Sequence, residues 1–133
     1  MLSYLSIGAN DIETSGRFYA AVLVPLGYEQ MRTERHFGFF IPGVADRDNG
    51  PGTIWVGPPF DGGPATSGNG MMPAFQASTR ALVRSAYEAG MAGGGTDEGG
   101  PGLRPHYGEN FYVAYLRDPV GNKLAIFCTS AGE

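Results

Sequence analysis

The sequence of 133 residues has little cysteine, histidine or positive charge. Its one cysteine, Cys128, cannot form a disulfide within the chain, which favours a reducing, cytoplasmic environment. Nine basic residues against thirteen acidic ones give a net charge of -4, so no basic surface for a nucleic acid is expected. No apolar run approaches the roughly 20 residues of a membrane span, and the first residues do not resemble a signal peptide. Nucleic acids and membranes are therefore not expected partners.

What the sequence does contain is a core-forming share of apolar residues and many glycines. Hydrophobic residues make up 42% of the chain, which is typical of one folded domain of this length. The 22 glycines and 10 prolines are clustered, and the segment 57–70 is too rich in both for regular structure. We therefore expect a single domain, 1–133, divided into module one (about 1–57), a loop (58–69) and module two (about 70–129).

Module one is predicted to begin with a strand over 2–9, in which alternate side chains face opposite sides of a sheet. Asn10 is the expected helix cap, and Glu13 three residues later would complete a capping box. Pro25 and Gly27 should end that helix. Three short apolar runs bounded by turn residues then predict strands over 28–32, 36–41 and 53–56.

Module two shows the same order of signals. A strand is predicted over 71–77, with Ser78 or Thr79 as the cap of a helix that continues to Met91. The glycine-rich segment 93–105 is predicted to be a loop. Two strands over 110–117 and 123–129 follow, joined by a tight turn at 118–122, where proline and glycine occupy favourable positions.

The two modules align at an offset of 68 residues. Tyr19 then matches Tyr87, and four further pairs agree: Ile7 with Phe75, Ala9 with Ala77, Ala21 with Ala89, and Gly27 with Gly95. A duplicated unit explains this register, although any two strand-helix units share some likeness. Two such units would curl their sheets around a shared cleft, where small ligands usually bind.

Several motifs are similar to one known family. The segment 112–124, Tyr-Val-Ala-Tyr-Leu-Arg-Asp-Pro-Val-Gly-Asn-Lys-Leu, resembles the last hairpin of the glyoxalase/bleomycin-resistance/dioxygenase superfamily, also called the vicinal oxygen chelate superfamily. The opening segments 4–12 and 17–19 resemble its first strand and helix, and 102–107 resembles a loop of small bacterial members. The resemblance implies an α+β fold of two paired β-α-β-β-β modules, a cleft between curved mixed sheets, and a homodimer.

Enzymes of this family usually hold a divalent metal ion with histidine and glutamate side chains. Carried over by position, the resemblance places the two histidines at Tyr4 and Met72 and the glutamate at Ala125. Phenol, thioether and methyl groups are not ordinary ligands for such an ion, and a catalytic metal generally needs three protein ligands. We therefore expect neither a metal nor another cofactor.

Strand alternation places mostly apolar side chains in the expected cleft. The predicted ligand-binding residues are Tyr4, Ser6, Trp55, Met72, Gln76, His106, Tyr107, Ala125 and Phe127. The alternative is that these side chains fill the cleft as core. Trp55 could stack on a planar ligand, but a lone tryptophan in an apolar strand is usually a core residue. Catalytic residues are unknown. His106 is the one plausible acid or base, and an exposed loop histidine without a function is the other reading.

Three functions remain open from the sequence. The first is binding of a small apolar or aromatic molecule in a metal-free cleft, as bleomycin-resistance proteins bind their drug without chemistry. The alternative is a metal-dependent lyase, isomerase or dioxygenase whose ligands have moved to His36, His106, Glu109 or a partner subunit. The third is a structural subunit whose main role is dimerisation.

Overall fold

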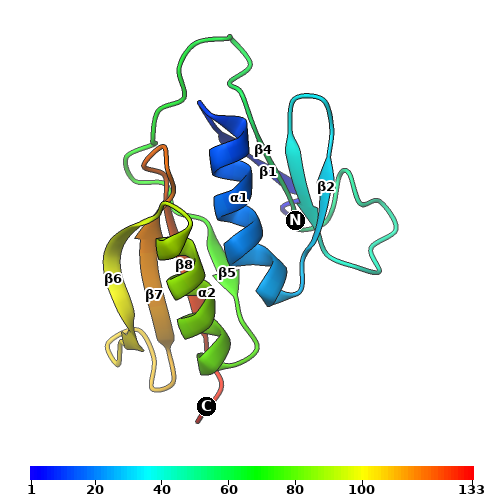
Figure 1. The fold of residues 1–133 in the computed structure, drawn as a ribbon. Coiled ribbons are helices and arrows are strands. Elements are labelled where there is room, and N and C mark those ends of the chain that lie inside the picture. The colour runs from blue at the N-terminus through cyan, green and yellow to red at the C-terminus, as the bar shows by residue number, and fades with distance from the viewer.

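The computed structural model describes residues 1–133 and contains two four-stranded sheets, each covered on one face by a helix (Figure 1). Module one contains β1 (Tyr4–Gly8), α1 (Ile12–Leu23), a short 3-10 turn η1 (Val24–Leu26), β2 (Glu29–Arg32), β3 (Phe37–Phe40) and β4 (Thr53–Gly57). Module two contains β5 (Ala74–Gln76), α2 (Arg80–Ala92), β6 (Thr96–Leu103), β7 (Tyr112–Arg117) and β8 (Lys123–Cys128). Neither helix has the length and apolar character that crossing a bilayer requires.

The two sheets have the same topology. Their strand orders are β1-β4-β3-β2 and β5-β8-β7-β6. In each module the first strand along the chain pairs in parallel with the last, β1 with β4 and β5 with β8. Helix α1 begins at Ile12 and α2 at Arg80, which are 80 − 12 = 68 residues apart, the offset seen in the sequence. The expected α+β fold of two β-α-β-β-β modules is therefore confirmed.

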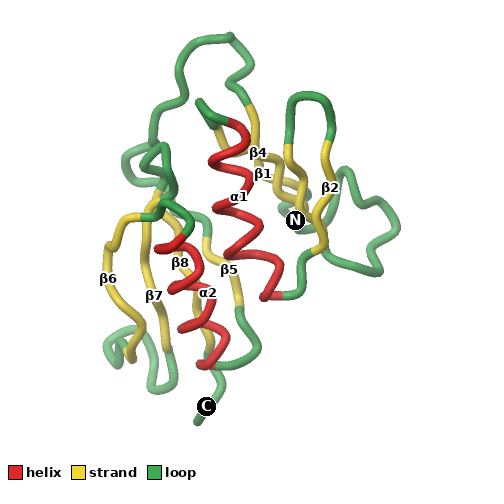
Figure 2. The backbone as a smooth tube through the Cα atoms, in the orientation of Figure 1, coloured by secondary structure: helices red, strands yellow, loops and turns green.

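The core lies between the helices and the sheets. Helices α1 and α2 lie side by side (Figure 2) and pack closely because Gly90 has no side chain, since a Cβ there would lie 2.9 Å from Val22 Cγ2. The predicted alternation in β1 is confirmed, because Ile7 is 8% exposed and faces the helices while Tyr4 is 49% exposed on the other side. In each sheet, we call the side turned away from the helix its open face.

One buried hydrogen bond joins the two modules. The phenol of Tyr19 in α1 donates to Oδ2 of Asp118, which lies in the turn between β7 and β8, at 2.6 Å. The other carboxylate oxygen of Asp118 accepts hydrogen bonds from the backbone N–H groups of Val120, Gly121 and Asn122 at 2.9–3.0 Å. The predicted tight turn at 118–122 is therefore confirmed. Both side chains are buried, so burial and the neighbouring carboxylate raise the pKa of Tyr19 well above its ordinary value.

The cap of the first helix was predicted one residue too early. Asp11 caps α1, with its Oδ1 accepting from the backbone N–H of Thr14 at 3.1 Å. Asn10 instead bonds Ala65 in the loop after β4, through Oδ1 at 2.7 Å and Nδ2 at 3.3 Å. Glu13 forms an ion pair with Arg32, so no capping box is present. Either neighbouring residue can cap a helix, and only the fold shows which of them is needed elsewhere.

The glycine-rich segment 93–105 was predicted to be a loop, and this was wrong for most of it. Residues Thr96–Leu103 form strand β6 at the edge of the second sheet, paired with β7. An edge strand tolerates glycine and proline because only one of its sides must pair. The pairing shifts register on both sides of Gly99, whose φ of +147° favours glycine. The first strand of module two is also shorter than predicted, at Ala74–Gln76.

Candidate functional site

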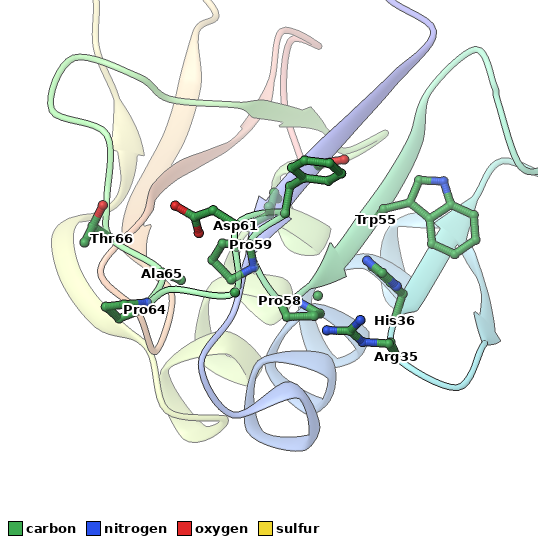
Figure 3. A pocket seen from close by; sticks show the side chains of 15 residues that line it. Arg35, His36, Trp55, Pro58, Pro59, Asp61, Pro64, Ala65 and Thr66 are labelled. Atoms are coloured by element: carbon green, nitrogen blue, oxygen red, sulfur yellow. The ribbon is translucent and has the colours of Figure 1, made fainter.

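An open groove of about 910 Å³ lies on the open face of the first sheet. Strands β1 and β4, the turn between β2 and β3, and the loop after β4 together form it (Figure 3). It is lined by Ser6, Ile7, Gly8, Arg35, His36, Trp55, Gly57, Pro58, Pro59, Phe60, Asp61, Gly62, Pro64, Ala65 and Thr66. All of these residues belong to module one and the loop that follows it.

Two glycines of neighbouring strands lie side by side at the base of the groove. Gly8 of β1 and Gly57 of β4 are partners in the parallel register, so no side chain rises from either strand at this point. The corresponding partners in module two, β5 and β8, are Gln76 and Phe127. The two sheets are therefore alike in topology, but the glycine pair is covered by the His36 ring and by Ala65, where the other sheet carries two large side chains of its own.

His36 occupies one side of the groove. Its ring packs so closely over Gly57 that a Cβ at that position would lie 2.2 Å from His36 Cδ2. The ring also meets Trp55 edge to face, with centroids 6.1 Å apart. No group of the chain hydrogen-bonds either ring nitrogen of His36, which leaves both available to a ligand.

Trp55 is the aromatic wall of the groove and is held in place from two sides. Its indole N–H donates to the backbone carbonyl of Asp48 at 2.9 Å. Its ring lies over Gly38 of β3, where a Cβ would lie 2.8 Å from Trp55 Cζ3. A side chain fixed in this way presents a preformed flat surface, which reduces the ordering that binding would require.

The loop after β4 closes the opposite side of the groove. The side-chain amide of Asn10 holds the backbone N–H and carbonyl of Ala65, as a neighbouring strand would. Pro58, Pro59 and Pro64 restrict the chain on the way to this anchor. The loop is thus fixed at its far end.

Charged groups stand on both sides of the groove. Figure 3 shows Arg35 and His36 beside Pro58, with Asp61 and Thr66 across the loop from them. Arg35 belongs to none of the four ion pairs of the chain, and neither does Asp61. Oδ1 of Asp61 accepts from the backbone N–H of Gly63 at 2.9 Å, which fixes the turn and leaves Oδ2 free.

Of the nine ligand-binding residues predicted from the sequence, the groove contains Ser6 and Trp55. Tyr4 lies instead in a smaller cavity of about 180 Å³, with Thr53 of β4 and Pro73 and Ala74 of module two. The remaining six line neither space: Met72, Gln76, His106, Tyr107, Ala125 and Phe127. The structure therefore does not bring the predicted set together in one cavity of a single chain.

Three of these six residues belong to a row of aromatic rings in module two. His106 contacts Tyr107 with ring centroids 4.1 Å apart and ring planes tilted by 42°, Tyr107 meets Phe111 at 5.8 Å, and Phe111 meets Phe127 at 5.7 Å. Tyr107 is 68% exposed, so the row ends in solvent. Lys123 and Ala125 share the open face of β8 with Phe127, while Cys128 is buried on the other side.

The residues at the expected metal positions do not suit a divalent ion. Tyr4 offers a phenol, Met72 a thioether, and Ala125 a methyl group that is only 2% exposed. Relocated ligands do not converge either, because no three histidine, cysteine, aspartate or glutamate side chains come close enough to hold an ion. His36 lies in module one, whereas His106 and Glu109 follow β6 in module two.

Arg35, His36 as a groove residue and Asp61 were not identified from the sequence. For His36 strand alternation was a usable signal. His36 comes two positions before Gly38, the register partner of Trp55, so the side chains of His36 and Trp55 point to the same side of the sheet. For Arg35 and Asp61 none existed, because turn and loop residues carry no periodicity that places them in space.

The chain is similar to solved structures over nearly its whole length. A glyoxalase/bleomycin resistance protein from Albidiferax ferrireducens T118 is 35% identical, with a TM-score of 0.82, and the match covers 96% of this chain and 98% of that one. A glyoxalase/bleomycin resistance protein/dioxygenase family enzyme from Burkholderia phytofirmans PsJN is 23% identical, with a TM-score of 0.69 and coverage of 97% and 98%. A glyoxalase-related enzyme from Fulvimarina pelagi is 21% identical, with a TM-score of 0.70 and coverage of 96% and 87%. No protein-family model and no curated protein matches the sequence.

Proposed function

This chain belongs to the glyoxalase/bleomycin resistance protein/dioxygenase superfamily, and on that premise we propose that it binds a small aromatic molecule in the groove of module one without a metal ion. The observation that carries the proposal is the pair of aromatic rings along the groove, in which the fixed indole of Trp55 meets a His36 ring that has no hydrogen-bond partner within the chain. Aromatic rings that border an open groove favour a planar ligand, which gains area and ring contacts against them.

Binding explains the groove better than a purely structural role does. A space of about 910 Å³ is large enough for a drug-sized molecule. It is bordered by a fixed indole, an unpaired imidazole and an anchored loop, rather than filled by neighbouring side chains. A subunit whose main role was dimerisation would need none of these.

The metal-free part of the proposal rests on the chemistry of the available donors. Phenol, thioether and methyl groups replace the ligands that the family uses, and no alternative trio of donors converges within the chain. No observation favours the metal-dependent lyase, isomerase or dioxygenase. Elemental analysis of protein purified without chelator tests this directly, because one zinc, nickel, manganese or iron per chain would contradict the metal-free proposal.

Trp55 supplies the test of binding, because it is the single tryptophan of the chain and lines the groove. A library of planar aromatic compounds should contain some that quench its fluorescence and raise the melting temperature in a saturable manner. The same compounds should stabilise the Trp55→Phe variant less than the natural protein. If no compound in a broad library changes either signal, the proposed function is wrong.

A homodimer is part of the same proposal. Several large apolar side chains are exposed outside the groove, among them Tyr4, Met71, Met72 and Tyr107, each at least 41% exposed. Light scattering during gel filtration should therefore give twice the chain mass of 14.1 kDa. A cytoplasmic location is also proposed, supported by the single buried thiol of Cys128, which needs no disulfide partner.

A further inference from the structure

The groove contains two charged side chains that have no ion-pair partner within the chain. Arg35 comes from the turn between β2 and β3, and Asp61 from the loop after β4. Neither pairs with the other or with any further ion, and Arg35 makes no hydrogen bond within the chain. Four other arginines do form ion pairs: Arg32, Arg47, Arg84 and Arg117.

At one side of the groove the chain offers donors in a pattern that suits a carboxylate. The guanidinium of Arg35 is planar and always charged, and it can donate two parallel hydrogen bonds to a carboxylate. Next to it, the ring nitrogens of His36 have no partner within the chain. A carboxylate placed here would meet a guanidinium and an imidazole together.

At the other side the chain offers acceptors. Oδ1 of Asp61 is engaged by the N–H of Gly63, and Oδ2 has no partner. The Thr66 hydroxyl, which also lines the groove, makes no hydrogen bond within the chain. A cationic ammonium group satisfies a free carboxylate oxygen and a hydroxyl at once, since it has three donors.

Between these two ends the lining is apolar, with Pro58 and Pro59 on the loop, while Trp55 lies beyond His36 and over Gly38 of β3 (Figure 3). Building on the proposed binding function, we propose that the groove selects an aromatic zwitterion, with a carboxylate held by Arg35 and His36 and an ammonium group held by Asp61. The aromatic ring joins the two charged groups and lies against Pro58 and Pro59, with its carboxylate beside the His36 ring that contacts Trp55.

The test uses four probes built on the same benzene ring. The probes are para-(aminomethyl)benzoate, which carries both charges, para-methylbenzoate, benzylamine, and the neutral para-methylbenzyl alcohol. Dissociation constants come from quenching of Trp55 and are checked by calorimetry with the full chain. Exposed ion pairs contribute modestly, so each charged end should tighten binding by about threefold and both together by about tenfold.

Matched variants assign each end. Arg35→Gln should cost the zwitterion and para-methylbenzoate about threefold in affinity and leave benzylamine unchanged. Asp61→Asn keeps the acceptor for Gly63 and should cost the zwitterion and benzylamine about threefold, leaving para-methylbenzoate unweakened. Arg104→Gln is the control, because Arg104 lies over Tyr115 in module two and should affect no probe.

The inference is overturned if the four probes bind equally, if the zwitterion does not bind, or if Arg104→Gln acts like Arg35→Gln. Equal binding would leave the proposed aromatic site standing, because the ring alone would then carry the affinity. A separate result contradicts the proposed function, namely that no compound of the wider aromatic library binds. High salt should reduce the advantage of the zwitterion, since exposed charges are screened.

Discussion

The phenol oxygen of Tyr19 lies 2.6 Å from Oδ2 of Asp118, and this buried bond joins the helix of module one to the hairpin turn of module two. The same carboxylate holds three backbone N–H groups of its own turn. The position of one module relative to the other is therefore tied to the shape of that turn. Removing the phenol should affect stability without touching the groove, in which neither residue takes part.

Tyr19→Phe is expected to destabilise the chain by about 2 kcal/mol at neutral pH, because a hydrogen bond to a buried charged group is lost. The substitution should also change how the free energy of unfolding depends on pH in the alkaline range. The folded chain raises the pKa of Tyr19, so above about pH 10 the unfolded chain binds fewer protons than the folded one. The stability that the protonated Tyr19 phenol contributes is fully present below about pH 10. At higher pH it declines by up to about 1.4 kcal/mol per pH unit.

Urea denaturation of both proteins between about pH 8 and about pH 11 measures this effect. The natural protein should lose stability faster than Tyr19→Phe as the pH rises, so the gap between them should narrow. A constant gap across that range would show that Tyr19 does not titrate differently in the two states.

Asn10 and Asp11 are neighbours with separate functions, so alanine at each should give a different result. Asn10→Ala should release the loop at Ala65, since both hydrogen bonds to that residue are lost. Asp11→Ala should remove the cap of α1 and cost about 1 kcal/mol. Amide hydrogen exchange separates them, with faster exchange expected at Ala65 in the first variant and at Thr14 in the second.

Ligand affinity should fall in Asn10→Ala by severalfold, because the loop that closes the groove is no longer preorganised. Asp11→Ala should bind as the natural protein does. Equal exchange at Ala65 in both variants would mean that the asparagine does not anchor the loop.

Gly57→Ala should disturb the groove with little effect on folding. The added methyl group would lie 2.2 Å from the His36 ring, which is only partly buried and can rotate away. Stability should change by less than about 1 kcal/mol, while ligand affinity drops. The histidine ring resonances in an NMR spectrum should move, which reports the displacement directly.

Gly16→Ala is the matched comparison, because its methyl group would also approach an aromatic ring to 2.2 Å. That ring belongs to Phe37, which is buried in the core and cannot leave. The expected cost is about 2 kcal/mol, even after the helix preference of alanine, about 1 kcal/mol, is taken into account. Similar stability losses in both variants would show that the His36 side is as rigid as the core.

The two histidines distinguish the groove from the aromatic row of module two. His36→Ala should weaken aromatic ligands about threefold, since a ring contact and a hydrogen-bond donor are lost. His106→Ala should change affinity little, because His106 contacts Tyr107 in module two and does not line the groove. The opposite result, with His106 dominant, would move the binding site to module two.

The fold was largely predictable because its signals are local. Strand alternation, the helix of module two with Thr79 as its cap, the turn at 118–122 and the 68-residue offset can all be read from neighbouring residues. The edge strand β6 was missed because glycine and proline signal a loop, although a strand with one free side accommodates both.

The candidate site was predictable only in part. Alternation correctly placed Ser6 on the open face, but the segment 58–66 was recognised only as a loop. Its return to Asn10 depends on two hydrogen bonds between residues 55 positions apart, which no sequence pattern encodes. Arg35, His36 and Asp61 line the same groove because the fold brings the turn between β2 and β3 close to the loop after β4, and no local pattern encodes that either.

The partners Gly8 and Gly57 in one sheet, and Gln76 and Phe127 in the other, make the two halves of the chain unequal. In module one this pair leaves room for the His36 ring and the anchored loop to lie over the strands, whereas in module two the strands carry large side chains of their own. Placing the larger pair in module one, as Gly8→Gln with Gly57→Phe, should therefore abolish recognition while preserving the strand order. Conversely, reducing Phe127 and Gln76 to glycine would open a second compartment, which gives a route to a chain with two binding places.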